Sequence, residues 1–152
     1  MVQKNINIQN KKARFEFEIL DKFVAGIQLT GTEIKSIRLS QARITESFCE
    51  FNEGGELFIV NMYIQEYMFG HHFNHKPKSE RRLLLNKREL RSLKRDVEAK
   101  GNTIVPLKLF INDRGFAKLE IALAKGKQTH DKREVIKDRD NKRDLARIKK
   151  NF

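Results

Sequence analysis

Three neighbouring histidines are the residues of this chain whose spacing comes nearest to a metal site. His71, His72 and His75 are three and four residues apart, which would place two imidazoles on one face of a helix. Gly70 and Pro77 enclose the group and disfavour a helix, and no cysteine or His-Glu pair accompanies it. We therefore predict no metal site and expect these histidines to lie in a loop, in contact with solvent or a binding partner.

Carboxylates that would support catalysis are dispersed along the chain. A nuclease needs clustered carboxylates to bind a metal ion, or a positioned pair of histidines. Here the acidic residues mostly alternate with basic ones. Gly31 and the Gly54-Gly55 pair lack the lysine spacing of a phosphate-binding loop, and Gly126 is only a flexible point between two lysines. The sequence thus predicts a protein without catalytic activity, cofactor or small-molecule substrate.

Basic side chains, in contrast, are present in large excess. Of the 152 residues, 32 are Lys or Arg, and the formal net charge is +12. Solubility alone asks for a net charge of about 2–8, whereas each cation placed at a phosphate releases condensed counterions. This excess favours RNA as the partner. The basic clusters ahead of the C-terminal region comprise Lys11, Lys12 and Arg14, and Lys76, Lys78, Arg81 and Arg82.

The region from residue 125 to residue 152 is the most basic part of the chain. It contains 11 Lys or Arg residues against 5 Asp or Glu residues, so its net charge of +6 is half of the total. Its apolar residues are too sparse to pack firmly on a core. We predict a tail that is disordered when free and becomes helical when its charge is neutralised.

Alternation of apolar and polar residues predicts six strands ahead of this tail. The predicted strands span residues 13–20, 23–29, 44–50, 57–64, 103–111 and 116–124. A turn at Asp21 and Lys22 would separate the first two, Gly54-Gly55 marks a hairpin between the next two, and residues 112–115 turn between the last two. Gly26 is expected at a bulge or at a close approach of two backbones.

Two helices interrupt the strands. Thr30 and Glu33 have the spacing of a capping box at the start of the first. The second helix, residues 86–100, is capped by Asn86 and ends at Gly101. Residues 65–80 show neither the apolar period of a helix nor that of a strand, and they are expected to form a long surface loop. The predicted fold class is mainly β with inserted helices, as a small closed antiparallel barrel over residues 1–124 followed by the basic tail, residues 125–152.

Two simple features bear on the compartment. Cys49 is the single cysteine, so neither an intrachain disulfide nor a cysteine metal cluster is expected, and its apolar surroundings predict a buried side chain. No apolar run approaches the roughly 20 residues that span a bilayer, and the N-terminus lacks the apolar stretch of a signal peptide. We expect a cytoplasmic protein that does not bind membranes.

Four stretches of the sequence, in order, resemble the SmpB family of SsrA-binding proteins, which partner transfer-messenger RNA (tmRNA) in bacteria. They lie at residues 10–13; residues 25–38, including Leu29-Thr30-Gly31-Thr32-Glu33; residues 82–90, Arg82-Leu83-Leu84-Leu85-Asn86-Lys87-Arg88-Glu89-Leu90; and the tail, with Ala124-Lys125-Gly126-Lys127, His130-Asp131-Lys132-Arg133 and Ala146-Arg147-Ile148.

The resemblance implies an oligonucleotide-binding-type barrel that holds the tRNA-like part of tmRNA. It also implies that the complex enters stalled ribosomes with the elongation factor that carries aminoacyl-tRNA, and that the tail probes the small-subunit decoding centre and the empty messenger channel. Together with the basic clusters, it gives the RNA-binding candidates Asn10, Lys11, Lys12, Arg14, Arg81, Arg82, Leu84 and Asn86.

In the tail, the resemblance gives His130, Asp131, Lys132 and Arg133 as decoding-centre candidates. The channel-directed candidates, including the start of the tail, are Lys125, Lys127, Lys137, Arg139, Lys142, Arg143, Arg147, Ile148 and Lys149. The chain departs from the family at Phe15 and Phe17, where His and Tyr are usual, at Val24, often acidic, and at Ser79, often Arg. No site role is carried over to Phe15, Val24 or Ser79.

Two other classes of protein remain open at this point. A structural ribosomal protein would be equally basic and equally tailed, and an enzyme acting on RNA would also need a basic surface. Co-purification with one structured RNA, rather than with every ribosome, distinguishes the first alternative. Cleavage of structured RNA in the presence of a divalent metal would reveal the second.

Overall fold

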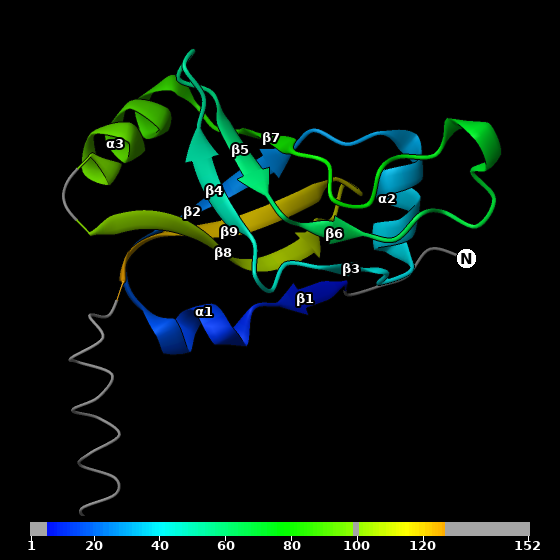
Figure 1. Ribbon diagram of the computed structural model, residues 1–152, viewed down its shortest axis with the longest axis horizontal. Coiled ribbons are helices and arrows are strands. Elements are labelled where there is room, and N and C mark those ends of the chain that lie inside the picture. The colour runs from blue at the N-terminus through cyan, green and yellow to red at the C-terminus, as the bar shows by residue number, and fades with distance from the viewer. Residues whose placement is uncertain (1–5, 99–100, 127–152) are drawn as a thin grey trace, which may run out of the picture.

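A ring of antiparallel strands forms the body of the protein (Figure 1). The computed structural model describes residues 6–98 and 101–126. Its strands are β1 (Asn7–Gln9), β2 (Phe17–Ile27), β3 (Ala42–Arg43), β4 (Phe48–Phe51), β5 (Leu57–Val60), β6 (Tyr63–Ile64), β7 (Arg81–Leu84), β8 (Asn102–Ile111) and β9 (Ala117–Gly126). Its helices are α1 (Lys11–Glu16), α2 (Gly31–Arg38) and α3 (Lys87–Val97), with a 3-10 turn at His71–Phe73.

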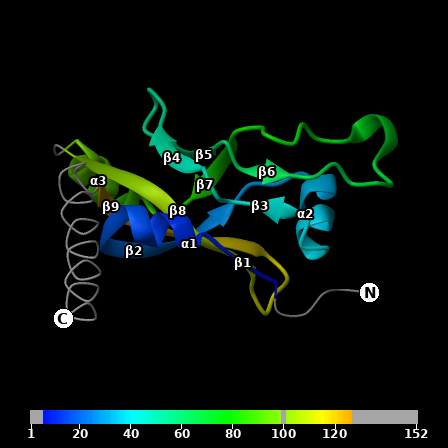
Figure 2. The same ribbon diagram turned by 60° about the horizontal axis from the view of Figure 1, so that its bottom comes forward.

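The order of strands in the large sheet is β1-β8-β4-β5-β7-β2-β9, and β8 also pairs with β9. This last pairing joins the two sides of the sheet, so β8, β4, β5, β7, β2 and β9 surround one core. The small sheet of β3 and β6 extends from the ring beside α2. Helices α2 and α3 lie at opposite ends of the ring, as Figures 1 and 2 both show. The predicted mainly β fold with inserted helices is confirmed.

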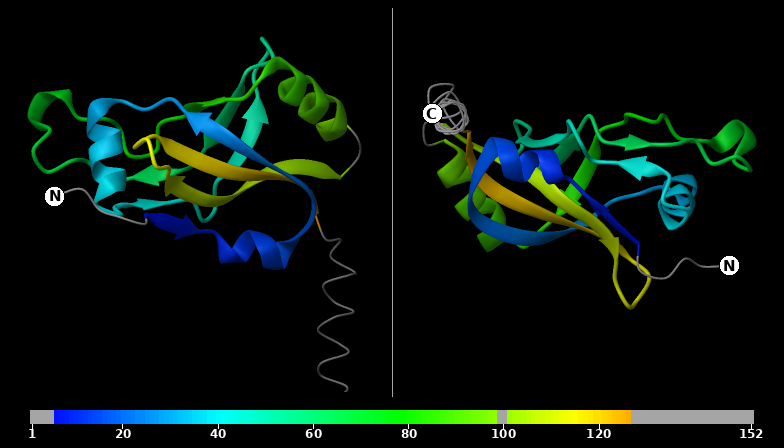
Figure 3. Two further views of the ribbon diagram at one scale, coloured as in Figure 1. Left: turned by 180° about the vertical axis from the view of Figure 1, so that it is seen from behind. Right: turned by 90° about the horizontal axis from the view of Figure 1, so that it is seen from below.

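Strands β8 and β9 bury both faces over residues 104–107 and 121–124, because the core lies on one side and α1 covers the other (Figure 3). Leu119 and Ile121 of β9 point into the ring, whereas Ala122 and Ala124 belong to a second cluster with Ala13 of α1. The small alanine side chains allow the helix to lie close against the strand. Cover by α1 on the outer side thus explains why β9 is apolar without interruption from Ile121 to Ala124.

The strand predicted over residues 13–20 is correct only from Phe17, because residues 11–16 form α1. Asn10 begins this helix, and its side-chain Oδ1 accepts a hydrogen bond from the Ala13 amide at 3.2 Å. The predicted turn at Asp21 and Lys22 was wrong. β2 is one strand that pairs with β9 throughout, with a register shift between Ile19 and Asp21. The shift changes the side-chain alternation without ending the strand.

The middle of the chain also differs from the prediction in its boundaries. The strand predicted over residues 44–50 begins only at Phe48, because Glu46 has a positive φ of 71° in a turn. The strand predicted over residues 57–64 is divided at Asn61, with a φ of 66°, into β5 and β6. The short strands β1 and β7 were not predicted, since three or four residues carry too little alternation to be recognised.

Several local predictions are confirmed. Thr30 and Asn86 both cap helices with complete capping boxes. The turn over residues 112–115 joins β8 and β9, and Gly115 adopts a φ of 86° there. Gly101 has a φ of 85°, Cys49 is buried, and residues 65–80 form a long loop. Within residues 6–98 and 101–126, no helix is long and apolar enough to span a membrane.

Candidate RNA-binding surface

The outer face of β2 and β7 carries an exposed patch that joins the central candidates from the sequence. Gly26 of β2 pairs with Leu84 of β7, and Lys118 of β9 pairs with Gly26 on the other side. Leu84 is 49% exposed and Val24 is 53% exposed. We call Val24, Gly26, Leu84, Asn86 and Lys118 the β2–β7 patch.

Gly26 allows the elements of this patch to approach closely. A Cβ atom at this position would lie 3.3 Å from Leu84 Cβ and 3.7 Å from the Lys118 ammonium. The absence of a side chain therefore leaves a shallow site between an apolar group and a cation. The close approach expected at Gly26 is confirmed. Lys118 was missed by the sequence reasoning, because only the pairing of β2 with β9 brings it beside residues more than 80 positions away.

Asn86 lies at the edge of the patch and starts α3. Its side-chain oxygen accepts a hydrogen bond from the Glu89 amide at 2.8 Å, while the Glu89 carboxylate accepts one from the Asn86 amide. The Asn86 side chain is exposed, so its amino group faces outward while its oxygen holds the helix. The same residue therefore positions α3 and offers a hydrogen-bond donor beside Leu84.

Asn10 is not part of this exposed surface. Its side chain is buried and donates hydrogen bonds to the carbonyl oxygens of Pro106 at 3.0 Å and Ile44 at 3.4 Å, besides capping α1. All of its polar atoms are therefore used inside the protein. We correct its expected role from RNA contact to an internal connection between α1, β8 and the turn before β4.

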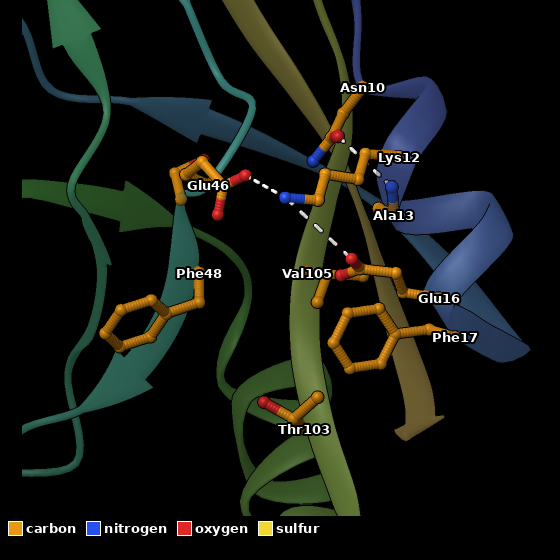
Figure 4. A pocket seen from close by; sticks show the side chains of 10 residues that line it. Asn10, Lys12, Ala13, Glu16, Phe17, Glu46, Phe48, Thr103 and Val105 are labelled. Carbon is orange, nitrogen blue, oxygen red and sulfur yellow. Dashed lines mark hydrogen bonds and ion pairs between the residues drawn. The ribbon is translucent and has the colours of Figure 1, made fainter. Parts of the chain in front are cut away.

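Lys12 lies beside a cleft between α1 and the start of β4 (Figure 4). Its ammonium group forms an ion pair with Glu46 and lies 3.8 Å from the Glu16 carboxylate. The hydrogen bond to Glu46 and the two negative charges raise the pKa of Lys12 above its usual value. Two carboxylates therefore already neutralise Lys12. Lys11 and Arg14 are exposed on the same helix, and neither forms an ion pair within the described part of the chain.

Arg81 and Arg82 point in opposite directions, as adjacent residues of a strand must. Arg81 is 3% exposed and is bound by Glu33, so its expected RNA contact is corrected to a structural role. Arg82 is exposed and lies 3.0 Å from Glu56. The sequence alone did not distinguish these two side chains.

The long loop between β6 and β7 is attached at its base and apolar at its tip. His75 lies 2.9 Å from both Thr32 Oγ1 and the Ile64 carbonyl oxygen, which fixes the loop to α2 and β6. His75 is half-buried, so this structural role adds to the predicted contact with solvent or RNA. Met68, Phe69 and Phe73 are exposed. Among the described residues, no group of three or more His, Cys, Asp or Glu side chains is arranged to hold a metal ion.

The tail candidates lie largely outside the described residues. Lys125 is the exception, because it pairs with Glu18 and Asn102 as part of β9 and so belongs to the ring. The positions outside the described residues are Lys127, His130, Asp131, Lys132, Arg133, Lys137, Arg139, Lys142, Arg143, Arg147, Ile148 and Lys149.

Comparison with known proteins now adds to this geometry. The model of the SmpB protein family matches residues 7–151. The chain belongs to the SmpB family. The match includes both the ring and the region that follows β9, so the resemblance seen in four separate stretches extends over nearly the whole chain.

Individual SmpB-family relatives agree with this assignment. The chain is 68% identical over 149 residues to the SsrA-binding protein of Flavobacterium psychrophilum, covering 98% of this chain and 99% of that protein. It is 64% identical to the SsrA-binding protein of Flavobacterium johnsoniae, covering 98% of both. A chain of the solved structure described as "tmRNA-SmpB: a journey to the center of the bacterial ribosome" is 47% identical, with a TM-score of 0.68, covering 82% of this chain and 86% of that one.

Proposed function

We propose that this protein binds the tRNA-like domain of tmRNA and delivers it to stalled ribosomes for trans-translation and ribosome rescue. Membership of the SmpB family and the SsrA-binding relatives support this function. The structural observation that carries it is the β2–β7 patch, where exposed Leu84 and Val24 flank the Lys118 cation across Gly26. Apolar groups can lie against ribose and base surfaces while a cation neutralises a phosphate.

We further infer that the ring is a barrel of the oligonucleotide-binding type. Its closure through β8 and β9 and its placement of short helices between strands support this interpretation. In such a barrel, the strands provide a rigid frame and the outer face of a few strands provides the binding surface. The β2–β7 patch occupies such a face, with Lys11 and Arg14 of α1 as further candidate contacts on the ring.

The tail has a separate role in this proposal. After β9 ends at Gly126, residues 127–152 enter the small-subunit decoding centre and the messenger channel, where negatively charged RNA neutralises their cations. His130, Asp131, Lys132 and Arg133 are the proposed decoding-centre contacts. The elongation factor that carries aminoacyl-tRNA accompanies the complex to the ribosome.

The proposed role is that of a non-catalytic protein of the bacterial cytoplasm, where stalled ribosomes occur. It requires binding and positioning, with no bond made or broken by the protein. Arg82 and Lys118 act through charge, so the affinity for RNA should depend on salt.

A gel-shift series over salt concentration tests the proposal. The full-length protein is titrated with the tRNA-like domain of tmRNA and, separately, with an ordinary elongator tRNA. We expect a steep salt dependence with both and tighter binding to the tRNA-like domain at every salt concentration. Equal binding to the two RNAs, together with stoichiometric recovery on all ribosomes, would instead favour the structural ribosomal protein.

A further inference from the structure

A second basic site lies at the α3 end of the ring, in the groove between α3 and the β4–β5 hairpin. This groove has a volume of 390 Å³ and is lined by Lys87, Leu90, Arg91 and Lys94 from the helix and by Gly54 and Gly55 from the hairpin. Three of its six residues are cationic and none is acidic. Every charged side chain that lines the groove is therefore positive, and Leu90 is its one apolar side chain.

The spacing of the three cations directs them to one side of α3. Residues four and seven apart on a helix lie on the same face, so Lys87, Arg91 and Lys94 form one row along the helix axis. This row is adjacent to the apolar stripe that contains Leu93, which is fully buried. Packing of Leu93 against the core therefore fixes the direction in which the row points.

Three carboxylates near α3 are occupied elsewhere, and Glu53, exposed in the hairpin turn, does not line the groove. Glu89 accepts the Asn86 amide in the capping box, Glu56 pairs with Arg82 at 3.0 Å, and Asp96 lies 3.6 Å from Arg95. No ion pair involves Lys87, Arg91 or Lys94 within the described part of the chain. Three like charges held together without acidic partners repel one another, and a bound polyanion relieves that repulsion.

The wall opposite the cations is formed by Gly54 and Gly55. Gly55 has a φ of 81°, and the Lys94 ammonium lies 4.0 Å from the position that a Cβ on this residue would occupy. The two glycines thus allow the hairpin to approach the helix without covering its cations. A groove with one cationic wall and one glycine wall has room for an extended phosphate backbone beside its cations.

We propose that this groove binds the phosphate backbone of an RNA strand that continues from the β2–β7 patch. The two sites adjoin, because Asn86 belongs to the patch and Lys87 is the next residue. This inference rests on the proposed function, and it adds a site formed by Lys87, Arg91 and Lys94. The strand is supplied either by tmRNA itself or by ribosomal RNA, which present the same phosphate chemistry.

Two double variants of full-length protein test the groove. Lys87→Gln/Arg91→Gln removes two charges from the groove, and Arg88→Gln/Arg95→Gln removes two exposed charges from the same helix outside it. Thermal melting checks that both variants fold as the wild type does. Each protein is then titrated, over a series of salt concentrations, with the tRNA-like domain of tmRNA and with ribosomes that lack tmRNA.

We expect the groove variant to bind the RNA that supplies the strand roughly tenfold more weakly at about 0.15 M salt. The plot of the logarithm of its association constant against the logarithm of salt concentration should be less steep than that of the wild type by about 1.5. The control variant should change the slope by less than half as much. Loss in the tmRNA series identifies tmRNA as the source of the strand, and loss in the ribosome series identifies ribosomal RNA.

Equal behaviour of the two double variants in both series would overturn the groove as a phosphate site. Failure of the proposed function has a different signature. In that case, the wild-type protein itself would not prefer the tRNA-like domain over ordinary tRNA, whatever the groove variant does.

Discussion

Arg81 and Glu33 form an ion pair inside the protein, with side chains only 2% and 5% exposed, although 48 residues separate them in the sequence. The Arg81 Nε lies 2.5 Å from Glu33 Oε2, and the guanidinium also donates to the carbonyl oxygens of Met62, Lys76 and Pro77. One arginine of β7 therefore holds α2, the segment between β5 and β6 and the end of the long loop together.

Replacement of Arg81 by Met should destabilise the protein strongly. The variant leaves the Glu33 carboxylate buried without its cation and three carbonyl oxygens without their donor, which costs about 3–5 kcal/mol of unfolding free energy. Urea denaturation measures the change. Arg82→Met is the matched control on the exposed side of the strand and should cost at most about 1 kcal/mol. Equal losses for both variants would contradict the assignment of Arg81.

Asn10→Ala should lower stability without changing RNA affinity. The substitution removes the cap of α1 and the hydrogen bonds to Pro106 and Ile44, with an expected loss of about 2 kcal/mol. Denaturation and gel shift are measured on the same protein at a temperature where it stays folded. Lys11→Gln, one residue along and exposed, is expected to show the opposite pattern. Loss of affinity in a fully folded Asn10→Ala protein would restore Asn10 as an RNA contact.

Leu84→Ala tests the apolar part of the β2–β7 patch. Because Leu84 is 49% exposed, its truncation should change the free energy of unfolding by less than about 1 kcal/mol. Its affinity for the tRNA-like domain should nevertheless fall about tenfold, since a buried leucine contact with RNA is lost. Leu20→Ala, 46% exposed and on the same strand as Val24, is the control and should bind as the wild type does.

Cys49 gives a prediction for alkaline pH. Burial raises the pKa of its thiol, so the folded state keeps the proton that the unfolded state loses above about pH 8.5. Its contribution to stability is therefore complete below that pH and decreases as the pH rises toward the raised folded pKa. The stability of Cys49→Ala should fall less between pH 8 and pH 10 than that of the wild type. Slow reaction of the native thiol with a thiol reagent at pH 8 provides an independent check.

Removal of residues 127–152 should separate RNA binding from activity on the ribosome. The truncation retains β9, including Lys125 and its pairing with Asn102, so the ring and the β2–β7 patch stay intact. We expect nearly unchanged affinity for the tRNA-like domain and complete loss of peptide tagging on stalled ribosomes. A large loss of affinity would show that the tail, rather than the ring, holds tmRNA. Truncation from residue 125 should additionally reduce stability, because it shortens β9.

The sequence by itself determined the features that depend on neighbouring residues. Both capping boxes, at Thr30 and Asn86, and the turn before Gly115 are local, because their hydrogen bonds join residues at most four positions apart. The excess of basic residues and the four family-like stretches can likewise be read from the sequence without knowledge of the fold. Together with the alternation of apolar and polar residues, they were sufficient to predict the mainly β class and the family.

Only the tertiary structure decided where α1, Arg81 and the basic groove lie. Residues 13–19 alternate as a strand does, yet Asn10 bonds to backbone 34 and 96 positions away and starts a helix there. Arg81 and Arg82 have the same chemistry, but the pairing of β7 buries one and exposes the other. In the groove, the β4–β5 hairpin lies beside α3, although more than 30 residues separate Gly55 from Lys87 in the sequence. Periodicity tells which residues are apolar, whereas the partners that a folded chain brings together decide what each polar side chain does.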